Sequence, residues 1–373
     1  MHPIKKLLFI GFLLTVSLQT AGQTLHPYFN KAEYKELLLI SVRTNSKKAY
    51  YSKFPAPEKF KKIYRSKVMG LDNLWELWIN PASTIAVISL RGTTRETESW
   101  LANFYAAMIP AKGKLYLSDT ETFAYELAPD PKAAVHIGWL IGMAFLSQDI
   151  VPKIDSLYQH GTKNFLLMGH SQGGAIDYLL TAYLYHLQQT GKLPKDIRFK
   201  TYCSASPKPG NLYFAYYYEN LTKNGWGFNV VNSADWVPET PITIQTLNDF
   251  NPTNPFTHAQ SEIKKLKFPE NLVLKHIYNQ LNKPTQKAQK NYEKYLGEKT
   301  SKIIMKNLKG FRPPAQYFNS NNYVRTGTTV VLYAGKKYYQ RFPNETGNMF
   351  THHMIDAYLY LLDGTKIPRK AAR

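Results

Sequence analysis

The chain has 373 residues and carries 47 Lys and Arg against 26 Asp and Glu, which gives a formal net charge of +21. Its hydrophobic fraction of 44% is enough to build a core and excludes a disordered chain, and its single Cys excludes a disulfide framework or a cysteine-clustered zinc or iron–sulfur site. The positive charge alone favours an anionic partner, such as nucleic acid, a membrane surface or an acidic substrate.

The first 22 residues have the pattern of a secretory signal peptide. Lys5 and Lys6 precede a short apolar stretch at 7–18, and small residues follow it up to Gly22. A helix over that stretch would rise only about 18 Å, which is too short to cross a bilayer core. We therefore predict cleavage near Gly22 and export of residues 23–373. Export makes nucleic acid a disfavoured partner, and no later apolar stretch is long enough to span a membrane.

The predicted elements of the exported chain alternate between strands and helices. A helical lead-in is predicted at 27–70, and a buried helix at 135–146. The apolar, β-branched run at 84–90 is typical of a central strand that is covered on both faces. Further strands are predicted at 75–79, 165–168, 199–203, 228–231 and 328–333, and further helices at 174–187 and 354–362. This alternation predicts a doubly wound, mostly parallel α/β sheet with helices on both faces.

The composition changes in the second half of the chain. Residues 261–310 contain twelve Lys and four Glu, a net charge of +8, and their apolar residues have helical spacing. We predict a basic helical insertion within 242–315 that belongs to a single domain over 23–373. The insertion precedes the strand at 328–333.

The segment Gly169-His-Ser-Gln-Gly-Gly174 joins a predicted strand to a predicted helix. This is G-x-S-x-G in the strand–turn–helix context of a nucleophile elbow. The glycines remove Cβ atoms that would clash in so sharp a turn, and the helix N-terminus offers N–H groups to a developing oxyanion. We predict Ser171 as a nucleophile. A chance match in a glycine-rich turn is the alternative.

A serine nucleophile needs a general base that is oriented by a carboxylate, and in α/β-hydrolases these follow the serine as Asp or Glu and then His. Asp235 comes directly after the predicted strand at 228–231, whereas Asp249 lies in an Asn- and Pro-rich loop with no strand before it. We predict Asp235 as the orienting carboxylate. A turn-forming Asp before Trp-Val-Pro is the alternative interpretation.

Two adjacent histidines, His352 and His353, precede the helix predicted at 354–362. They are the expected candidates for the base, and because adjacent side chains point in different directions, only one of them would serve. His170, beside the candidate nucleophile, and His136, in the apolar helix, are interpreted as structural.

The oxyanion hole needs a second donor from another strand end. Arg91-Gly-Thr93 directly follows the run at 84–90, so the backbone N–H of Thr93 could act with that of Gln172, and the Thr93 hydroxyl could add a third hydrogen bond. An ordinary glycine turn that closes a strand is the alternative.

Taken together, six sequence blocks resemble the class 3 lipase family of the α/β-hydrolase fold. The elbow is close to the family's GHSxGGA pattern, and the blocks span residues 75–241 and 320–364. In chain order they are Ile88–Thr93 with Trp100–Phe104, Val135–Trp139, Gly169–Ala175, Ser204–Asn211, Val230–Pro238 and His353–Leu362. The register of the last block selects His353 over His352.

The resemblance implies an exported, bacterial-type lipase or carboxylesterase. Ser171 would be the nucleophile, Asp235 the orienting carboxylate and His353 the base, with Thr93 and Gln172 in the oxyanion hole and no metal or cofactor. Two features depart from the family. The basic insertion occupies a connection that is usually shorter, and residues 105–134, where the family carries its lid, could form an amphipathic lid or a fixed loop.

The predicted substrate is an ester, most naturally an acylglycerol-type lipid. The alternatives are a phospholipid or a cell-wall or polysaccharide ester, and the positive charge could favour contact with an anionic lipid surface. A non-catalytic binding protein on a hydrolase scaffold is a further alternative. The sequence makes no prediction of oligomeric state or acyl length.

Overall fold

The computed structural model describes residues 24–344 and 347–365, so the predicted signal peptide at 1–22 lies outside the described residues. Its centre is a seven-stranded sheet with the order β1-β2-β3-β8-β9-β11-β13. The strands are β1 (Lys61–Arg65), β2 (Trp75–Ile79), β3 (Ile85–Leu90), β8 (Asn164–His170), β9 (Arg198–Ser204), β11 (Gly227–Asn232) and β13 (Thr328–Leu332).

The sheet is mostly parallel. Each neighbouring pair from β3 to β13 is parallel, and only β1 and β2 add antiparallel pairs at one edge. The predicted doubly wound α/β fold is confirmed. The helical lead-in predicted at 27–70 is only partly correct, because β1 lies within it. The side chains of Lys61, Lys62 and Arg65 are exposed on this edge strand, so it lacks the apolar alternation that would have revealed a strand.

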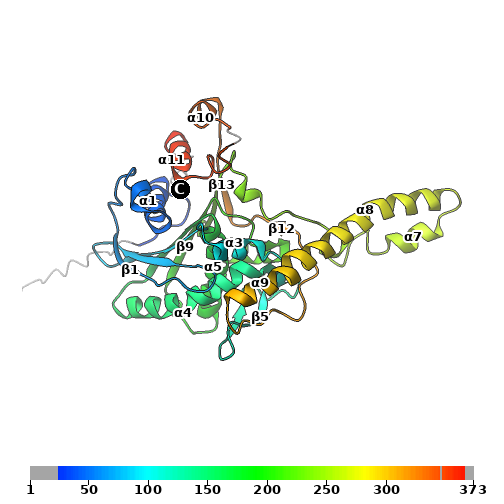
Figure 1. The fold of residues 1–373 in the computed structure, drawn as a ribbon, viewed down its shortest axis with the longest axis horizontal. Coiled ribbons are helices and arrows are strands. Elements are labelled where there is room, and N and C mark those ends of the chain that lie inside the picture. The colour runs from blue at the N-terminus through cyan, green and yellow to red at the C-terminus, as the bar shows by residue number, and fades with distance from the viewer. Residues whose placement is uncertain (1–23, 345–346, 366–373) are drawn as a thin grey trace, which may run out of the picture.

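Helices cover both faces of the sheet. Along β3, Val87 packs into one core with α1 (Lys31–Asn45) and α11 (Ile355–Gly364), whereas Ile88 packs into the other with α4 (Ile137–Gln159) and α5 (Gln172–Gln189). Figure 1 shows α1 and α11 on one side of the sheet and α4 on the other. The strands are therefore buried on both faces, as their continuous apolar runs predict.

Two smaller sheets lie beside the main one. One has the order β12-β10-β7-β4, and the other is the hairpin β5–β6. Their bounds are β4 (Met108–Pro110), β5 (Lys112–Tyr116), β6 (Thr122–Glu126), β7 (Ala134–His136), β10 (Gly210–Asn211) and β12 (Tyr323–Val324). In the hairpin, Leu115 and Phe123 are buried in the core formed with α4 and α5, and the Phe123 ring lies 5.3 Å from that of Tyr183.

Short polar contacts set the beginnings of several helices. Asn30 caps α1 by accepting a hydrogen bond from the Glu33 amide, and Asn211 caps α6 (Leu212–Leu221) in the same way. Outside the basic segment, the other helices are α2 (Lys48–Tyr51), α3 (Thr97–Phe104) and α10 (Lys336–Arg341), with short 3₁₀ turns at Val237–Glu239 and Leu247–Asp249. None of the helices in the described ranges is long and apolar enough to cross a membrane.

The basic segment 261–310 is helical, as predicted. It forms α7 (Ala259–Lys265), α8 (Glu270–Glu293), a π-helical turn (Lys294–Lys299) and α9 (Thr300–Asn307). Figure 1 shows α7 and the first half of α8 projecting away from the rest of the molecule as an arm. At the other end of this arm α9 contacts α3, and Ile304 is fully buried in the core.

Candidate active site

Ser171 occupies a sharp turn between β8 and α5. Its backbone has φ 63° and ψ −132°, a strained combination for a residue with a side chain. The flanking glycines make the turn sterically feasible. A Cβ on Gly169 would lie 2.1 Å from the Gly173 carbonyl carbon, and one on Gly173 would lie 2.6 Å from the Leu90 carbonyl oxygen. The local geometry is that of a nucleophile elbow, with a half-buried serine at the N-terminus of a helix.

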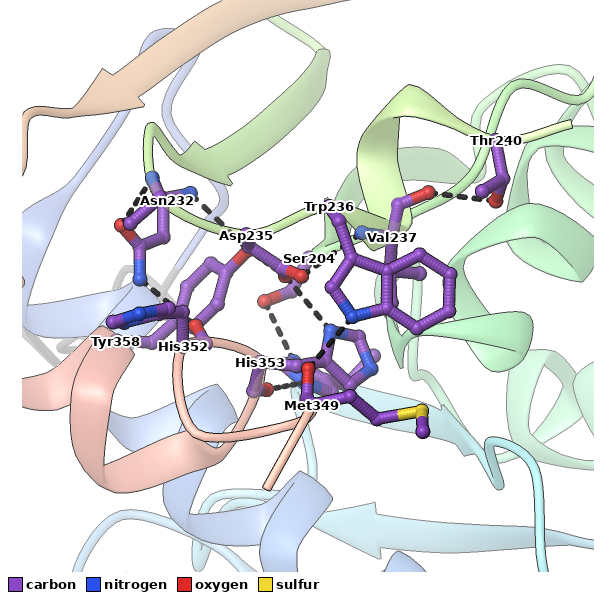
Figure 2. Close-up of polar contacts among 12 residues, drawn as sticks. Ser204, Asn232, Asp235, Trp236, Val237, Thr240, Met349, His352, His353 and Tyr358 are labelled. Atoms are coloured by element: carbon purple, nitrogen blue, oxygen red, sulfur yellow. Dashed lines mark hydrogen bonds and ion pairs between the residues drawn. The ribbon is translucent and has the colours of Figure 1, made fainter. Parts of the chain in front are cut away.

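Asp235 and His353 meet at the carboxyl ends of the parallel strands, where Ser171 follows β8. Asp235 follows β11, and its Oδ2 lies 2.8 Å from Nδ1 of His353, which precedes α11. Both side chains are buried. Figure 2 shows the carboxylate of Asp235 directed at the imidazole of His353. Because the carboxylate accepts, Nδ1 of His353 carries the proton and leaves Nε2 free to act as a base.

Burial alone would raise the pKa of Asp235. The charge of His353 and its hydrogen bond, the amide of Val237 and the hydroxyl of Tyr358 together outweigh burial and lower that pKa below its ordinary value. The Val237 amide donates to Oδ1 at 3.0 Å, and the Tyr358 hydroxyl donates to Oδ2 at 2.8 Å. Asp235 is therefore ionised and fixed in orientation, as a carboxylate that orients a base must be.

His170 connects the elbow to the loop of His353. Its Nε2 lies 2.8 Å from the His353 carbonyl oxygen, and the two imidazole rings are 4.8 Å apart. Because a carbonyl only accepts, Nε2 of His170 carries the proton, and Nδ1 accepts from the Ser204 hydroxyl at 3.0 Å. Burial, together with the neighbouring His353, lowers the pKa of His170 to about 3. This neutral histidine ties the His353 backbone to the residue that precedes Ser171.

His352 lies outside this arrangement. Its Nδ1 is 2.8 Å from the Tyr338 hydroxyl, and its Nε2 is 2.8 Å from the Asn344 side-chain oxygen. The other downstream candidate, Asp249, forms a capping box with Thr246. The structure therefore pairs Asp235 with His353, whose carbonyl is bonded to His170 next to Ser171, and leaves the two alternatives in other contacts.

The oxyanion block lies against the elbow. A Cβ on Gly92 would lie 3.4 Å from Cβ of Ser171, which puts Thr93 next to the candidate nucleophile. The side-chain amide of Asn103 on α3 donates to Thr93 Oγ1 at 3.0 Å, so the Thr93 hydroxyl proton is free to face the site. Asn103 Oδ1 accepts from the Gln172 side chain at 2.8 Å. The two residues predicted for the oxyanion hole are thus bridged by Asn103.

Asn103 is a supporting residue whose role the sequence did not reveal, and His136 supports it in turn. The indole N–H of Trp139 donates to Asn103 Oδ1 at 3.0 Å, and Nε2 of His136 lies 3.2 Å from the Asn103 carbonyl oxygen. The His136 ring stacks on Trp139 at 3.6 Å, and its burial lowers its pKa to about 3. His136 is thus structural, as interpreted from the sequence. The only available signal for Asn103 was its place in the Trp100–Phe104 block.

Aromatic side chains surround His353. The Phe350 ring lies 6.0 Å from the His353 ring, 5.7 Å from Trp236 and 6.5 Å from Trp100. Trp236 is 39% exposed, and Figure 2 shows its indole beside His353, with its N–H bonded to the Met349 carbonyl. These rings form an apolar rim, which suits a substrate that has an apolar part next to its reacting group.

The arrangement supplies the parts needed for nucleophilic attack on a carbonyl: a serine in an elbow, an oriented histidine and amide donors at a helix N-terminus. Within the part of the chain that the structure describes, no group of three or more His, Cys, Asp or Glu side chains could hold a metal ion.

Residues 87–245 match the family described as Lipase (class 3). The chain is 32% identical over 120 residues to triacylglycerol lipase OBL1 of Ricinus communis, and the match covers 31% of this chain and 21% of that protein. It therefore spans only about a fifth of the plant lipase's length.

Two solved lipase structures are similar to part of the chain. A fungal lipase–inhibitor complex is 21% identical, with a TM-score of 0.43, and the match covers 57% of this chain and 74% of that chain. Lip2 lipase of Yarrowia lipolytica is 20% identical, with a TM-score of 0.41 and coverages of 59% and 79%.

Proposed function

We propose that this chain, whose residues 87–245 match the class 3 lipase family, hydrolyses carboxylic esters through an acyl-enzyme on Ser171. The observation that carries the proposal is the strained Ser171, whose neighbour His170 is bonded to the loop of the buried Asp235–His353 pair. Strain at a non-glycine residue is typical of functional sites, and a carboxylate–imidazole pair at the same sheet edge supplies the base that serine requires.

In the proposed reaction, Nε2 of His353 takes the proton of Ser171 as its oxygen attacks the ester carbonyl. Asp235 holds the resulting imidazolium in place, and the backbone N–H groups of Thr93 and Gln172 bind the oxyanion. His353 then protonates the leaving alcohol, which departs and leaves an acyl-serine. A water molecule activated by His353 attacks the acyl group, and Ser171 recovers its proton when the acid is released.

The substrate class that we propose is an acylglycerol-type lipid ester. The support is the apolar rim of Trp100, Trp236 and Phe350 around His353. A phospholipid or a cell-wall or polysaccharide ester is the second candidate, favoured by the excess of Lys and Arg over Asp and Glu, which would attract an anionic surface. For 105–134 we propose a fixed segment and not a mobile lid, because Leu115 and Phe123 are buried in the core.

We propose further that residues 23–373 form one exported hydrolase domain, with the basic insertion at 242–315 as a peripheral addition. Support for the single domain comes from α9, whose Ile304 is buried in the same core as α4 and α5. Support for export comes from the signal-like pattern at 1–22.

The test is a panel of esters offered to the purified protein. It includes p-nitrophenyl esters of increasing acyl length, triacylglycerols and phospholipids, and each is assayed with wild type and Ser171→Ala. We expect hydrolysis by wild type, a preference for apolar acyl chains and loss of activity in Ser171→Ala with unchanged thermal unfolding. A folded wild-type protein that cleaves none of these esters would instead support a non-catalytic binding protein.

A further inference from the structure

The arm carries an unusual number of exposed apolar side chains at its far end. We define the arm tip as residues 256–281, which include α7 and the first half of α8. Phe268, in the turn between the two helices, is 78% exposed, and Leu281 is 69% exposed. The other large apolar side chains that are exposed there are Phe256, Leu266, Leu272, Val273, Leu274 and Ile277. Exposed apolar clusters of this kind mark interaction sites, because water disfavours them.

The arm tip has no core of its own. Between residues 251 and 288, all of which the structure describes, no side chain is buried. Most of the stability of a helix in a protein comes from packing its apolar face against other elements. The tip therefore exposes an apolar surface that a partner would stabilise.

The apolar side chains of α8 form a continuous stripe. Val273, Ile277 and Leu281 follow one another at intervals of four residues, so they lie on one face of the helix. The half-buried Asn271 and Tyr278 are seven residues apart and lie on a different face. Since α7 is the element that contacts this part of α8, the stripe of Val273, Ile277 and Leu281 is left uncovered.

The charges around this surface are mainly positive. The arm tip has four lysines against two glutamates, and Lys264, Lys265 and Lys267 interleave with Leu266 and Phe268 at its end. All three lysines are exposed. A second copy of the same positive surface would be repelled, whereas an anionic surface would be attracted. Interleaved lysines and large apolar side chains are typical of helices that lie in the interface of an anionic membrane.

We propose that the arm tip docks the enzyme on an anionic lipid bilayer. Its apolar side chains enter the headgroup boundary, and its lysines contact the lipid phosphates or carboxylates. This inference rests on the proposed function only in taking a lipid-containing surface as the place of work. It does not require any particular ester to be the substrate.

The arm is joined firmly to the catalytic region. From α8 the helix continues through the π-helical turn into α9, which contacts α3, the helix of Asn103. At this junction a Cβ on Gly297 would lie 2.9 Å from Ala107 and 2.9 Å from Tyr317, so the close approach depends on glycine. A docked arm would therefore hold the catalytic region at a defined distance from the bilayer.

The test is flotation of the purified full chain with vesicles of phosphatidylcholine alone and of phosphatidylcholine with a quarter phosphatidylglycerol. The apolar variant is Val273→Ser with Ile277→Ser and Leu281→Ser. The charge variant is Lys264→Gln with Lys265→Gln and Lys267→Gln. Its matched control removes the same number of charges from Lys192, Lys195 and Lys223, which are exposed in the loops that follow α5 and α6.

We expect wild type to float with anionic vesicles, and both arm variants to lose at least tenfold in partition coefficient while the control does not. Hydrolysis of a water-soluble p-nitrophenyl ester should be unchanged in both arm variants and in the lysine control. Ser171→Ala should lose this hydrolysis but float like wild type, so docking and catalysis fail separately. Equal flotation of wild type and arm variants, or no flotation of wild type, would overturn the proposal. A dimer that only the arm variants disrupt would also overturn it and identify the tip as a protein interface.

Discussion

Nδ1 of His353 lies 2.8 Å from Oδ2 of Asp235, although 118 positions separate the two residues in the chain. The whole basic insertion, including the arm, lies between them in the chain. They nevertheless meet because β13 pairs in parallel with β11, and because the Tyr358 hydroxyl on α11 also binds the Asp235 carboxylate at 2.8 Å. The sheet and α11 thus fix the pair, and the insertion is accommodated outside the site.

The two adjacent histidines provide a matched comparison. His353→Gln should lower kcat by about 10⁴-fold or more, because the serine loses its only oriented base. His352→Gln should change kcat by no more than a few-fold, since the ring of His352 is bonded to Tyr338 and Asn344 and not to Asp235. The measurement is kcat on p-nitrophenyl butyrate, with thermal unfolding as a check that each variant folds. Equal losses in the two variants would show that the base has been misassigned.

The Thr93 hydroxyl can be tested separately from its backbone N–H. Asn103 donates to its oxygen, so its own proton is free for the oxyanion. Thr93→Val should lower kcat about 10²-fold and leave KM nearly unchanged, because the lost bond forms mainly in the transition state. Thr94→Val is the control, since that hydroxyl donates to Asp72 at 2.5 Å. A rise in KM with unchanged kcat for Thr93→Val would assign the hydroxyl to substrate binding instead.

Buried His136 predicts a pH dependence of stability. Its pKa is lowered from 6.5 to about 3 in the folded chain, mainly by burial. Between these pH values His136 binds a proton in the unfolded chain but not in the folded chain. The free energy of unfolding should therefore fall as pH falls from 6.5 toward 3. The contribution of one such group to the slope is about 1.4 kcal/mol per pH unit.

His136→Asn is the variant that isolates this effect. Asparagine can keep the N-cap of α4, where His136 Nδ1 now accepts from the Trp139 amide, but it cannot titrate. The measurement is urea unfolding of wild type and variant at several pH values between 4 and 7. The free energy of unfolding should change less steeply with pH in the variant, by the equivalent of about one proton. An unchanged slope would mean that His136 is protonated in the folded protein.

The elbow and the central strands could be predicted from sequence because their signals are local. The apolar, β-branched run of β3 and the glycines around Ser171 each determine one kind of structure. The strand β1 was missed because, on an exposed sheet edge, Lys61, Lys62 and Arg65 give no apolar alternation. Its pairing with β2 is a tertiary contact that no local pattern encodes.

The supporting residues of the site could not be found from sequence for a related reason. Tyr358 and Asn103 contact Asp235 and Thr93 only after distant elements pack together, and both residue types are common in helices that have no such role. The helical character of 261–310 was predicted from composition and spacing. That its apolar side chains remain exposed on an arm depends on the absence of an opposing element, which a helical pattern does not reveal.

The most direct test of the account is to identify the residue that an ester-mimicking inhibitor labels. The full chain is treated with a fluorophosphonate, which forms a stable bond to an activated serine, and the adduct is located by mass spectrometry of the peptides. We expect one adduct on Ser171, loss of esterase activity in proportion to labelling, and no adduct in Ser171→Ala or His353→Gln. An adduct on another residue, or full activity in protein whose Ser171 is completely labelled, would contradict the assignment of Ser171 as the nucleophile.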